Sequence, residues 1–103
     1  MYKKISLSEP YFEKEEIINL KECIKLGYLC EGQFIKKFEN QLQKILKTKY
    51  ILGCINGTSA LHLALRAINV SKDDEIIVPT LTFIAPVNSI LYCGASPIFM
   101  DSD

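Results

Sequence analysis

The chain has 103 residues, of which 49% are apolar, with twelve basic and twelve acidic side chains. This length corresponds to about one small domain, and the apolar content excludes a disordered tail. The formal net charge of zero removes the usual electrostatic case for binding nucleic acid or an anionic membrane.

Targeting and metal signals are weak in this sequence. No apolar run reaches the roughly 18 residues that span a bilayer, and the start MYKKISLSEPYFEKEE lacks the apolar region of a signal peptide. The four cysteines form no CxxC pair and only one histidine is present, so we expect no metal site. We interpret the cysteines as buried, reduced thiols of a cytoplasmic protein.

The first half of the chain predicts two amphipathic helices. From Glu13 to Leu26, apolar residues recur at helical spacing, and Gly27 ends the helix as glycine often does. The loop GYLCEGQ follows. A second helix is expected from Phe34 to Leu46, with Lys, Glu and Gln on its polar face.

The second half alternates between strands and helices. Tyr50 to Ile55 is a continuous apolar run that is typical of a strand buried on both faces. Helix Ser59 to Ile68 is apolar nearly all round, so we expect it to be largely buried. The remaining expected elements are the polar turn NVSKDDE, strand Glu75 to Val78, helix Thr82 to Tyr92 ended by Gly94, and strand Pro97 to Met100.

Two helices followed by β-α-β-α-β indicate an α/β fold with parallel strands and right-handed crossovers. The chain stops at Asp103, shortly after a strand, and three parallel strands leave two long edges uncovered. We therefore expect an incomplete unit, the N-terminal fragment of a larger domain.

The stretch NGTS, residues 56–59, lies between an expected strand and an expected helix. Ligands of open α/β sheets bind at this carboxyl end of the strands. Gly57 permits close backbone approach, while Thr58 and Ser59 offer hydroxyls and free amides at a helix N-terminus, which suits a phosphate. A single monoester phosphate fits best, because the stretch matches neither GxxxxGK[ST] nor GxGxxG.

The residues alone leave other interpretations open. Ser and Thr are ordinary helix N-caps, so phosphate binding and simple capping remain alternatives. His62 and Arg66 form a polar stripe on the same helix, for which a catalytic role is the less favoured interpretation. Phe83 is expected in the first turn of the next helix, where it could stack on a flat ring or pack against the sheet.

The sequences NGTSALHLAL and DDEIIVPTLTFIAPVNSILYCGASPIFMD resemble the opening of the DegT/DnrJ/EryC1/StrS sugar aminotransferases. An SEP start, a G-[aromatic]-x-x-x-G loop and the pair Phe38-Glu39 fit as well, so the resemblance covers essentially the whole chain. TLTFIAPVNSI and SEPY look most similar to the legionaminic-acid and perosamine branches. The resemblance implies the large domain of a fold-type I enzyme that uses pyridoxal 5'-phosphate (PLP).

The resemblance also implies roles for individual residues. Gly57, Thr58 and Ser59 would hold the cofactor phosphate, and Phe83 would stack on the pyridine ring. Gly27, Tyr28, Leu29 and Asn56 would line the sugar-nucleotide side. Residues 1–48 would be an N-terminal helical segment, and residues 49–103 the truncated start of the PLP-binding domain.

The family activity transfers an amino group, usually from glutamate, to a nucleotide-linked 4-keto-6-deoxy sugar for surface polysaccharide. Its sites are completed across a homodimer interface. The Schiff-base lysine of the family lies downstream of anything present here, so no catalytic residue is expected in this chain and the chain alone is expected to be inactive. The rival hypotheses are a non-catalytic module that binds a phosphorylated ligand, and the null product of a truncated gene.

Overall fold

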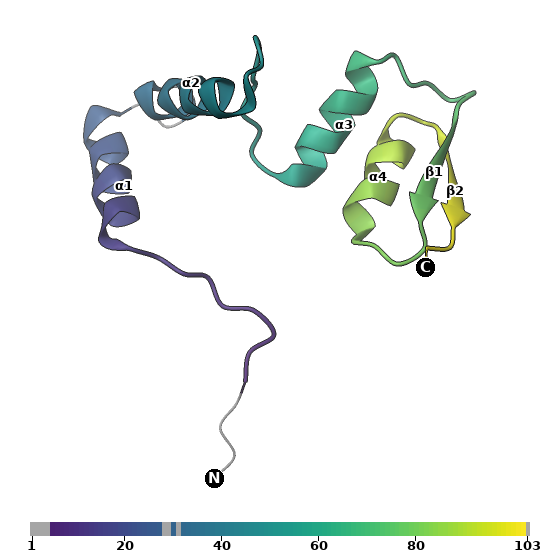
Figure 1. Cartoon of the computed structure of the whole chain (residues 1–103), viewed down its shortest axis with the longest axis horizontal. Coiled ribbons are helices and arrows are strands. Elements are labelled where there is room, and N and C mark those ends of the chain that lie inside the picture. Colours follow the sequence, from purple (N-terminus) through teal and green to yellow (C-terminus); the bar gives the residue numbers. More distant parts are fainter. Residues whose placement is uncertain (1–4, 28–29, 31, 103) are drawn as a thin grey trace. The chain divides into compact units, whose positions relative to one another are not determined.

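The computed structural model describes residues 5–27, 30 and 32–102, and it has an α/β fold (Figure 1). The elements of the described residues are, in chain order, α1 (Lys14–Leu26), α2 (Gln33–Leu46), α3 (Gly57–Ala67), β1 (Glu75–Pro79), α4 (Ile84–Tyr92) and β2 (Ser96–Met100). They fall into two compact units, Met1–Ile51 and Leu52–Asp103. The predicted fold class and these six elements are confirmed, with boundaries within two residues.

The first unit contains α1 and α2, whose ends follow ordinary capping chemistry. The carboxylate of Glu16 accepts the backbone N–H of Glu13 at 2.7 Å, which satisfies a donor at the start of α1. Gly27 ends α1 in the left-handed conformation, with φ of 71°. No residue of either helix is buried, and Phe34, Ile35 and Leu42 are half-buried, so both apolar stripes are at least partly exposed.

The second unit is built on two parallel strands. β1 and β2 pair in register from Glu75 opposite Ser96 to Pro79 opposite Met100. Helix α4 packs on this sheet, and the core lies between them (Figure 1). The core side chains are Val70, Val78, Ile90, Cys93 and Ala95, with Leu65, Ile76 and Val87 packed against them.

The polar turn before β1 is held by its own hydrogen bonds. The carboxylate of Asp74 accepts the backbone N–H of Ser71 at 2.7 Å and its hydroxyl at 3.2 Å. The carbonyl of Asp74 accepts the N–H of Ser96 at 3.0 Å, which ties the turn to the start of β2. The turn therefore sits at the amino-terminal edge of the sheet.

The strand expected from Tyr50 to Ile55 is not formed. Residues 50–54 have no regular secondary structure, and the sheet of the described residues has the order β1-β2. A strand is stabilised by hydrogen bonds to a neighbour, so an apolar run that pairs with neither β1 nor β2 stays irregular. The βαβαβ pattern is thus reduced to a βαβ unit that follows α3.

The expectation that the helix after this run is largely buried is also wrong. No residue of α3 is buried, because only one of its sides packs on α4.

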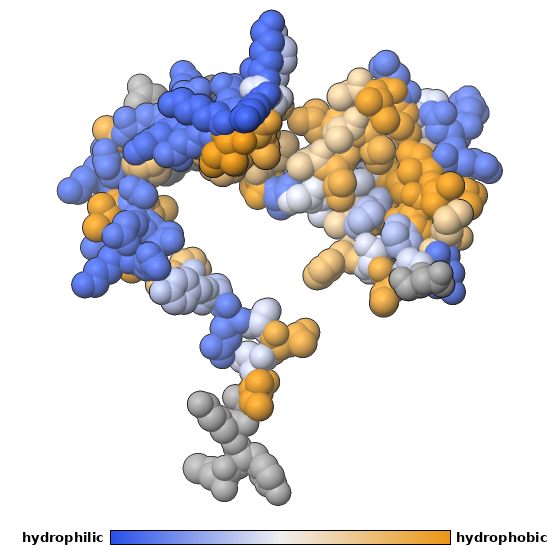
Figure 2. Space-filling view, in the orientation of Figure 1, coloured by the Kyte–Doolittle hydropathy of each residue, from blue (hydrophilic) through white to orange (hydrophobic). Residues whose placement is uncertain are grey.

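The burial expected for the cysteines holds for Cys93, whereas Cys30 and Cys54 are exposed and all four thiols are free. Apolar side chains gather on the surface of the second unit (Figure 2). Within the described residues, no helix has the length and apolarity needed to cross a membrane.

Candidate cofactor-phosphate site

The N-terminus of α3 is formed by the NGTS stretch. Asn56 is the N-cap, and its side-chain Oδ1 accepts the backbone N–H of Ser59 at 2.8 Å. Its backbone carbonyl accepts the N–H of Ala60 at 3.1 Å. Asn56 therefore satisfies the third amide of the helix and leaves the first two to another acceptor.

Those two amides belong to Gly57 and Thr58. In the part of the chain that the structure describes, neither donates to a protein acceptor. Gly57 and Ser59 are exposed and Thr58 is half-buried, and a Cβ built on Gly57 would meet no atom within 4 Å. The helix N-terminus is thus open to an anion that could accept from both amides and from the two hydroxyls.

Helix α4 runs parallel to α3 and lies beside it. The hydroxyl of Ser89 is 3.2 Å from the carbonyl oxygen of Thr58, and the ring of Tyr92 is 5.6 Å from that of His62 in an edge-to-face arrangement. From the first contact to the second, the residue number increases along both helices. Their N-termini therefore point to the same side, where β1 and β2 also end (Figure 1).

Phe83 lies at this common end. It is the N-cap of α4 and not, as expected, in the first helical turn, because its extended backbone (ψ of 155°) precedes the helix. Its side chain is 85% exposed, so it does not pack against the sheet. An aromatic face is therefore available to a planar ligand on the side of the molecule where α3 offers its amides.

The same rim carries Thr80 and Asp101, one after each strand. The Thr80 hydroxyl donates to the Asp101 carboxylate at 3.3 Å, and the Thr80 N–H donates to the Met100 carbonyl at 2.9 Å. These bonds extend the ladder past the strands and fix the path of the chain into Phe83. His62, by contrast, lies midway along α3 against Tyr92, one turn beyond Thr58.

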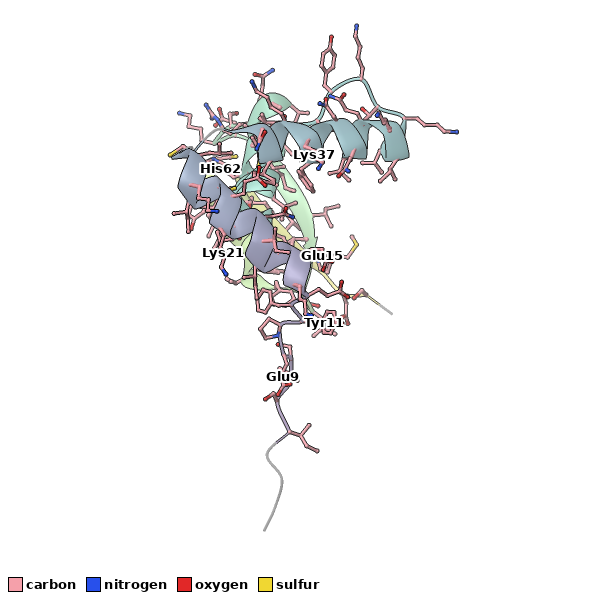
Figure 3. All side chains as sticks on the ribbon, turned by 90° about the vertical axis from the view of Figure 1, so that its left-hand side faces the viewer. Glu9, Tyr11, Glu15, Lys21, Lys37 and His62 are labelled. Carbon is pink, nitrogen blue, oxygen red and sulfur yellow. The ribbon has the colours of Figure 1, made fainter. Side chains whose placement is uncertain are left out.

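The residues expected on the sugar-nucleotide side are divided between the units. Asn56 is at the site, where its carbonyl oxygen is engaged by the cap and its Nδ2 remains as a donor. Gly27 belongs to the first unit, and Tyr28 and Leu29 lie outside the described residues. In the first unit, Figure 3 shows Tyr11 just before α1; its hydroxyl donates to Glu13 at 3.2 Å.

Sequence reasoning missed Ser89, which joins the two helices of the site. Its side chain is fully buried, and it also lies 2.8 Å from the carbonyl oxygen of Ala85. A serine in the middle of the apolar run IAPVNSILY was the available signal. Its partner is 31 residues away in the chain, which local patterns do not reveal.

Residues 10–103 match the model of the DegT/DnrJ/EryC1/StrS aminotransferase family. The chain belongs to this family. It is 45% identical over 102 residues to GDP-perosamine synthase of Escherichia coli O157:H7, an alignment that covers 98% of the chain and 28% of that protein. The chain thus spans about a quarter of the length of the family members it matches.

Solved structures of family members share the fold. Spr1654 from Streptococcus pneumoniae, in its PLP form, superposes with a TM-score of 0.88 at 30% identity, over 96% of this chain and 25% of that one. NtdA from Bacillus subtilis, crystallised with bound pyridoxamine phosphate (PMP), gives a TM-score of 0.79 at 32% identity, over 87% of this chain and 21% of its own.

Proposed function

We propose that this chain carries the phosphate-binding and ring-stacking part of a PLP-dependent nucleotide-sugar aminotransferase. The observation that carries the proposal is the open N-terminus of α3 on the same side of the second unit as an exposed Phe83. Family membership and the likeness to structures solved with PLP or PMP support the choice of cofactor.

The described residues fit the cofactor phosphate. A phosphate monoester needs several hydrogen-bond donors. The α3 N-terminus offers the amides of Gly57 and Thr58 and the hydroxyls of Thr58 and Ser59, and the open face of Gly57 lets the oxygens come close to the backbone. The dipole of an eleven-residue helix adds favourable positive potential there.

Each residue then has a defined task. Thr58 and Ser59 bind the phosphate, Asn56 orients the first turn of α3 by capping it, and Phe83 holds the pyridine ring flat by stacking. The bound cofactor supplies an electron sink for moving the amino group. The chain's own residues contribute affinity and orientation, which set the ring where the chemistry is to occur.

The finer parts of the proposal follow from the family. The donor is glutamate, the acceptor is a nucleotide-linked 4-keto-6-deoxy sugar, and the product enters surface polysaccharide. Gly27, Tyr28, Leu29 and Asn56 line the sugar-nucleotide side. Residues 1–48 form a helical segment and residues 49–103 begin the cofactor domain of a cytoplasmic homodimer. The chain by itself has no turnover.

The test is a titration of the ¹⁵N-labelled chain with PMP, followed by backbone amide chemical shifts. PMP is the right probe because PLP, an aldehyde, would react with the many exposed lysines. We expect shifts of the Gly57 and Thr58 amides and broadening of the Phe83 ring signals.

Two controls separate the alternatives. Pyridoxamine, which lacks the phosphate, should leave the chemical shifts of the Gly57 and Thr58 amides unchanged. Inorganic phosphate should change those amide chemical shifts without broadening the ring signals of Phe83. If inorganic phosphate binds as tightly as PMP and Phe83 never responds, the chain is a phosphate-binding module without a cofactor role. Unperturbed α3 amides at saturating PMP would disprove the proposed site.

A further inference from the structure

Two parts of the proposed site sit on different helices. The phosphate donors open α3, and the stacking ring of Phe83 precedes α4. A cofactor held at both points requires a fixed spacing between the two helix starts. Any contact that locks α3 to α4 near these starts therefore controls how well the site is preorganised.

Ser89 makes that contact. The contact is at the start of α3, whereas on α4 Ser89 lies six residues after Phe83, which is about 9 Å along the axis of an α-helix. Its Oγ is 3.2 Å from the carbonyl oxygen of Thr58, a phosphate-binding residue, and the side chain is fully buried. Among the described residues, this is the one side-chain hydrogen bond that joins α3 to α4.

The Ser89 hydroxyl has a single proton and two acceptors. Donation to Ala85, at 2.8 Å, is the ordinary bond of a serine to its own helix. Donation to Thr58 instead ties the helices together. Both carbonyl groups lie inside helices, so the loss of the hydroxyl would leave neither without a backbone donor. A Ser89→Ala change should therefore alter the position of α3 relative to α4 more than it alters the stability of the fold.

We propose that Ser89 is a positioning residue, which holds the first turn of α3 at a fixed place relative to Phe83. This inference rests on the proposed function in that it assigns the held turn to the cofactor phosphate. The contact between the helices needs a side chain that is small enough for this buried position and that carries a hydrogen-bond donor. Serine meets both requirements.

The test compares Ser89→Ala with a matched variant, Tyr92→Leu. The second change removes another contact between the helices, the ring pair with His62, which lies midway along α3 and one turn beyond Thr58. We expect Ser89→Ala to weaken PMP binding about threefold to tenfold, the range of one buried hydrogen bond. Tyr92→Leu should change that affinity less than twofold. Ser89→Cys, which keeps a donor of similar size, should restore part of the loss.

A second measurement needs no ligand. Amide hydrogen exchange in the first turn of α3 should speed up in Ser89→Ala relative to the turn around His62, and the order should reverse in Tyr92→Leu. If the parent chain binds no PMP, the proposed function fails, while the exchange pattern still decides whether Ser89 anchors α3. Equal effects of both variants, or none from Ser89→Ala in folded protein, would overturn the inference.

Discussion

The side chain of Asn56 accepts the backbone N–H of Ser59 at 2.8 Å, so one residue both caps α3 and borders the proposed phosphate. Substitution to Asp should separate these two effects. Aspartate is as good an N-cap as asparagine, so the stability of α3 should hold. Its negative charge, however, should repel the phosphate and weaken PMP binding by about tenfold.

The measurements for Asn56→Asp are helix content by circular dichroism and PMP affinity by titration. Asn56→Ala is the matched variant: it removes the cap, which costs about 1 kcal/mol, without adding charge. If Asn56→Asp bound PMP as well as the parent chain does, the phosphate would not lie at this helix end.

Gly57 offers a second separation of folding from binding. Its added Cβ would meet no protein atom, and alanine stabilises a helix by roughly 0.5–1 kcal/mol over glycine. Gly57→Ala should therefore raise the thermal stability slightly while it weakens PMP binding, because the methyl group narrows the approach to the amides. A Gly57→Ala variant with tighter PMP binding would refute the close-approach argument.

Gly27→Ala is the contrasting glycine variant. Gly27 has a φ of 71°, which costs an L-residue about 1–2 kcal/mol, so α1 should fray at its end. PMP binding at α3 should be unchanged.

The hydroxyls of Thr58 and Ser59 should contribute to affinity. A hydrogen bond to a charged group contributes about 1.5–3 kcal/mol, so the double variant Thr58→Val, Ser59→Ala should lose well over tenfold in PMP affinity. Thr48→Val is the matched control, since that hydroxyl belongs to the first unit, where it donates to the Tyr50 carbonyl at 3.4 Å. Retained PMP after dialysis of the double variant would contradict the assignment.

Local chemistry explains which elements could be predicted from the sequence. Gly27 and Asn56 end and begin their helices through bonds made within a few residues, so their patterns are visible in the chain. Residues 50–55 have the composition of a strand, but the sheet of the described residues has the order β1-β2 and does not include them. Ser89 depends on a carbonyl of a different helix, and Phe83 on a backbone turn one residue before α4. Such long-range terms decide what local propensity leaves open.

The open face of the sheet should limit solubility. Ile77 is 63% exposed and Ile98 is 41% exposed, and the two are paired in register on neighbouring strands. Ile77→Lys should raise the soluble yield and lower the binding of a hydrophobic dye, because it breaks this patch with a charge. Val78→Lys, at a position only 2% exposed, should instead prevent folding. Equal soluble yields of the parent chain and Ile77→Lys would show that this face of the sheet does not limit solubility.

The last prediction is that this chain of 103 residues has no aminotransferase activity. The chemistry requires a lysine amine beside the cofactor as a covalent anchor and proton carrier. The second unit contains Lys72, which lies in the turn before β1, whereas the proposed site is at the opposite end of the strands. Five strand residues span about 13 Å, so Lys72 is at the wrong end of the sheet.

Losing a covalent group removes a step outright, while losing a binding contact costs only a few kcal/mol. The purified chain should therefore form no amino sugar from PLP, glutamate and a GDP- or UDP-linked 4-keto-6-deoxy sugar, as measured by mass spectrometry. GDP-perosamine synthase of Escherichia coli O157:H7, assayed in parallel, is the positive control. If turnover exceeded that of a no-protein blank, the variant Lys72→Met would show whether this lysine reaches the site. Loss of activity in Lys72→Met would contradict the placement of Lys72 at the opposite end of the sheet from the site.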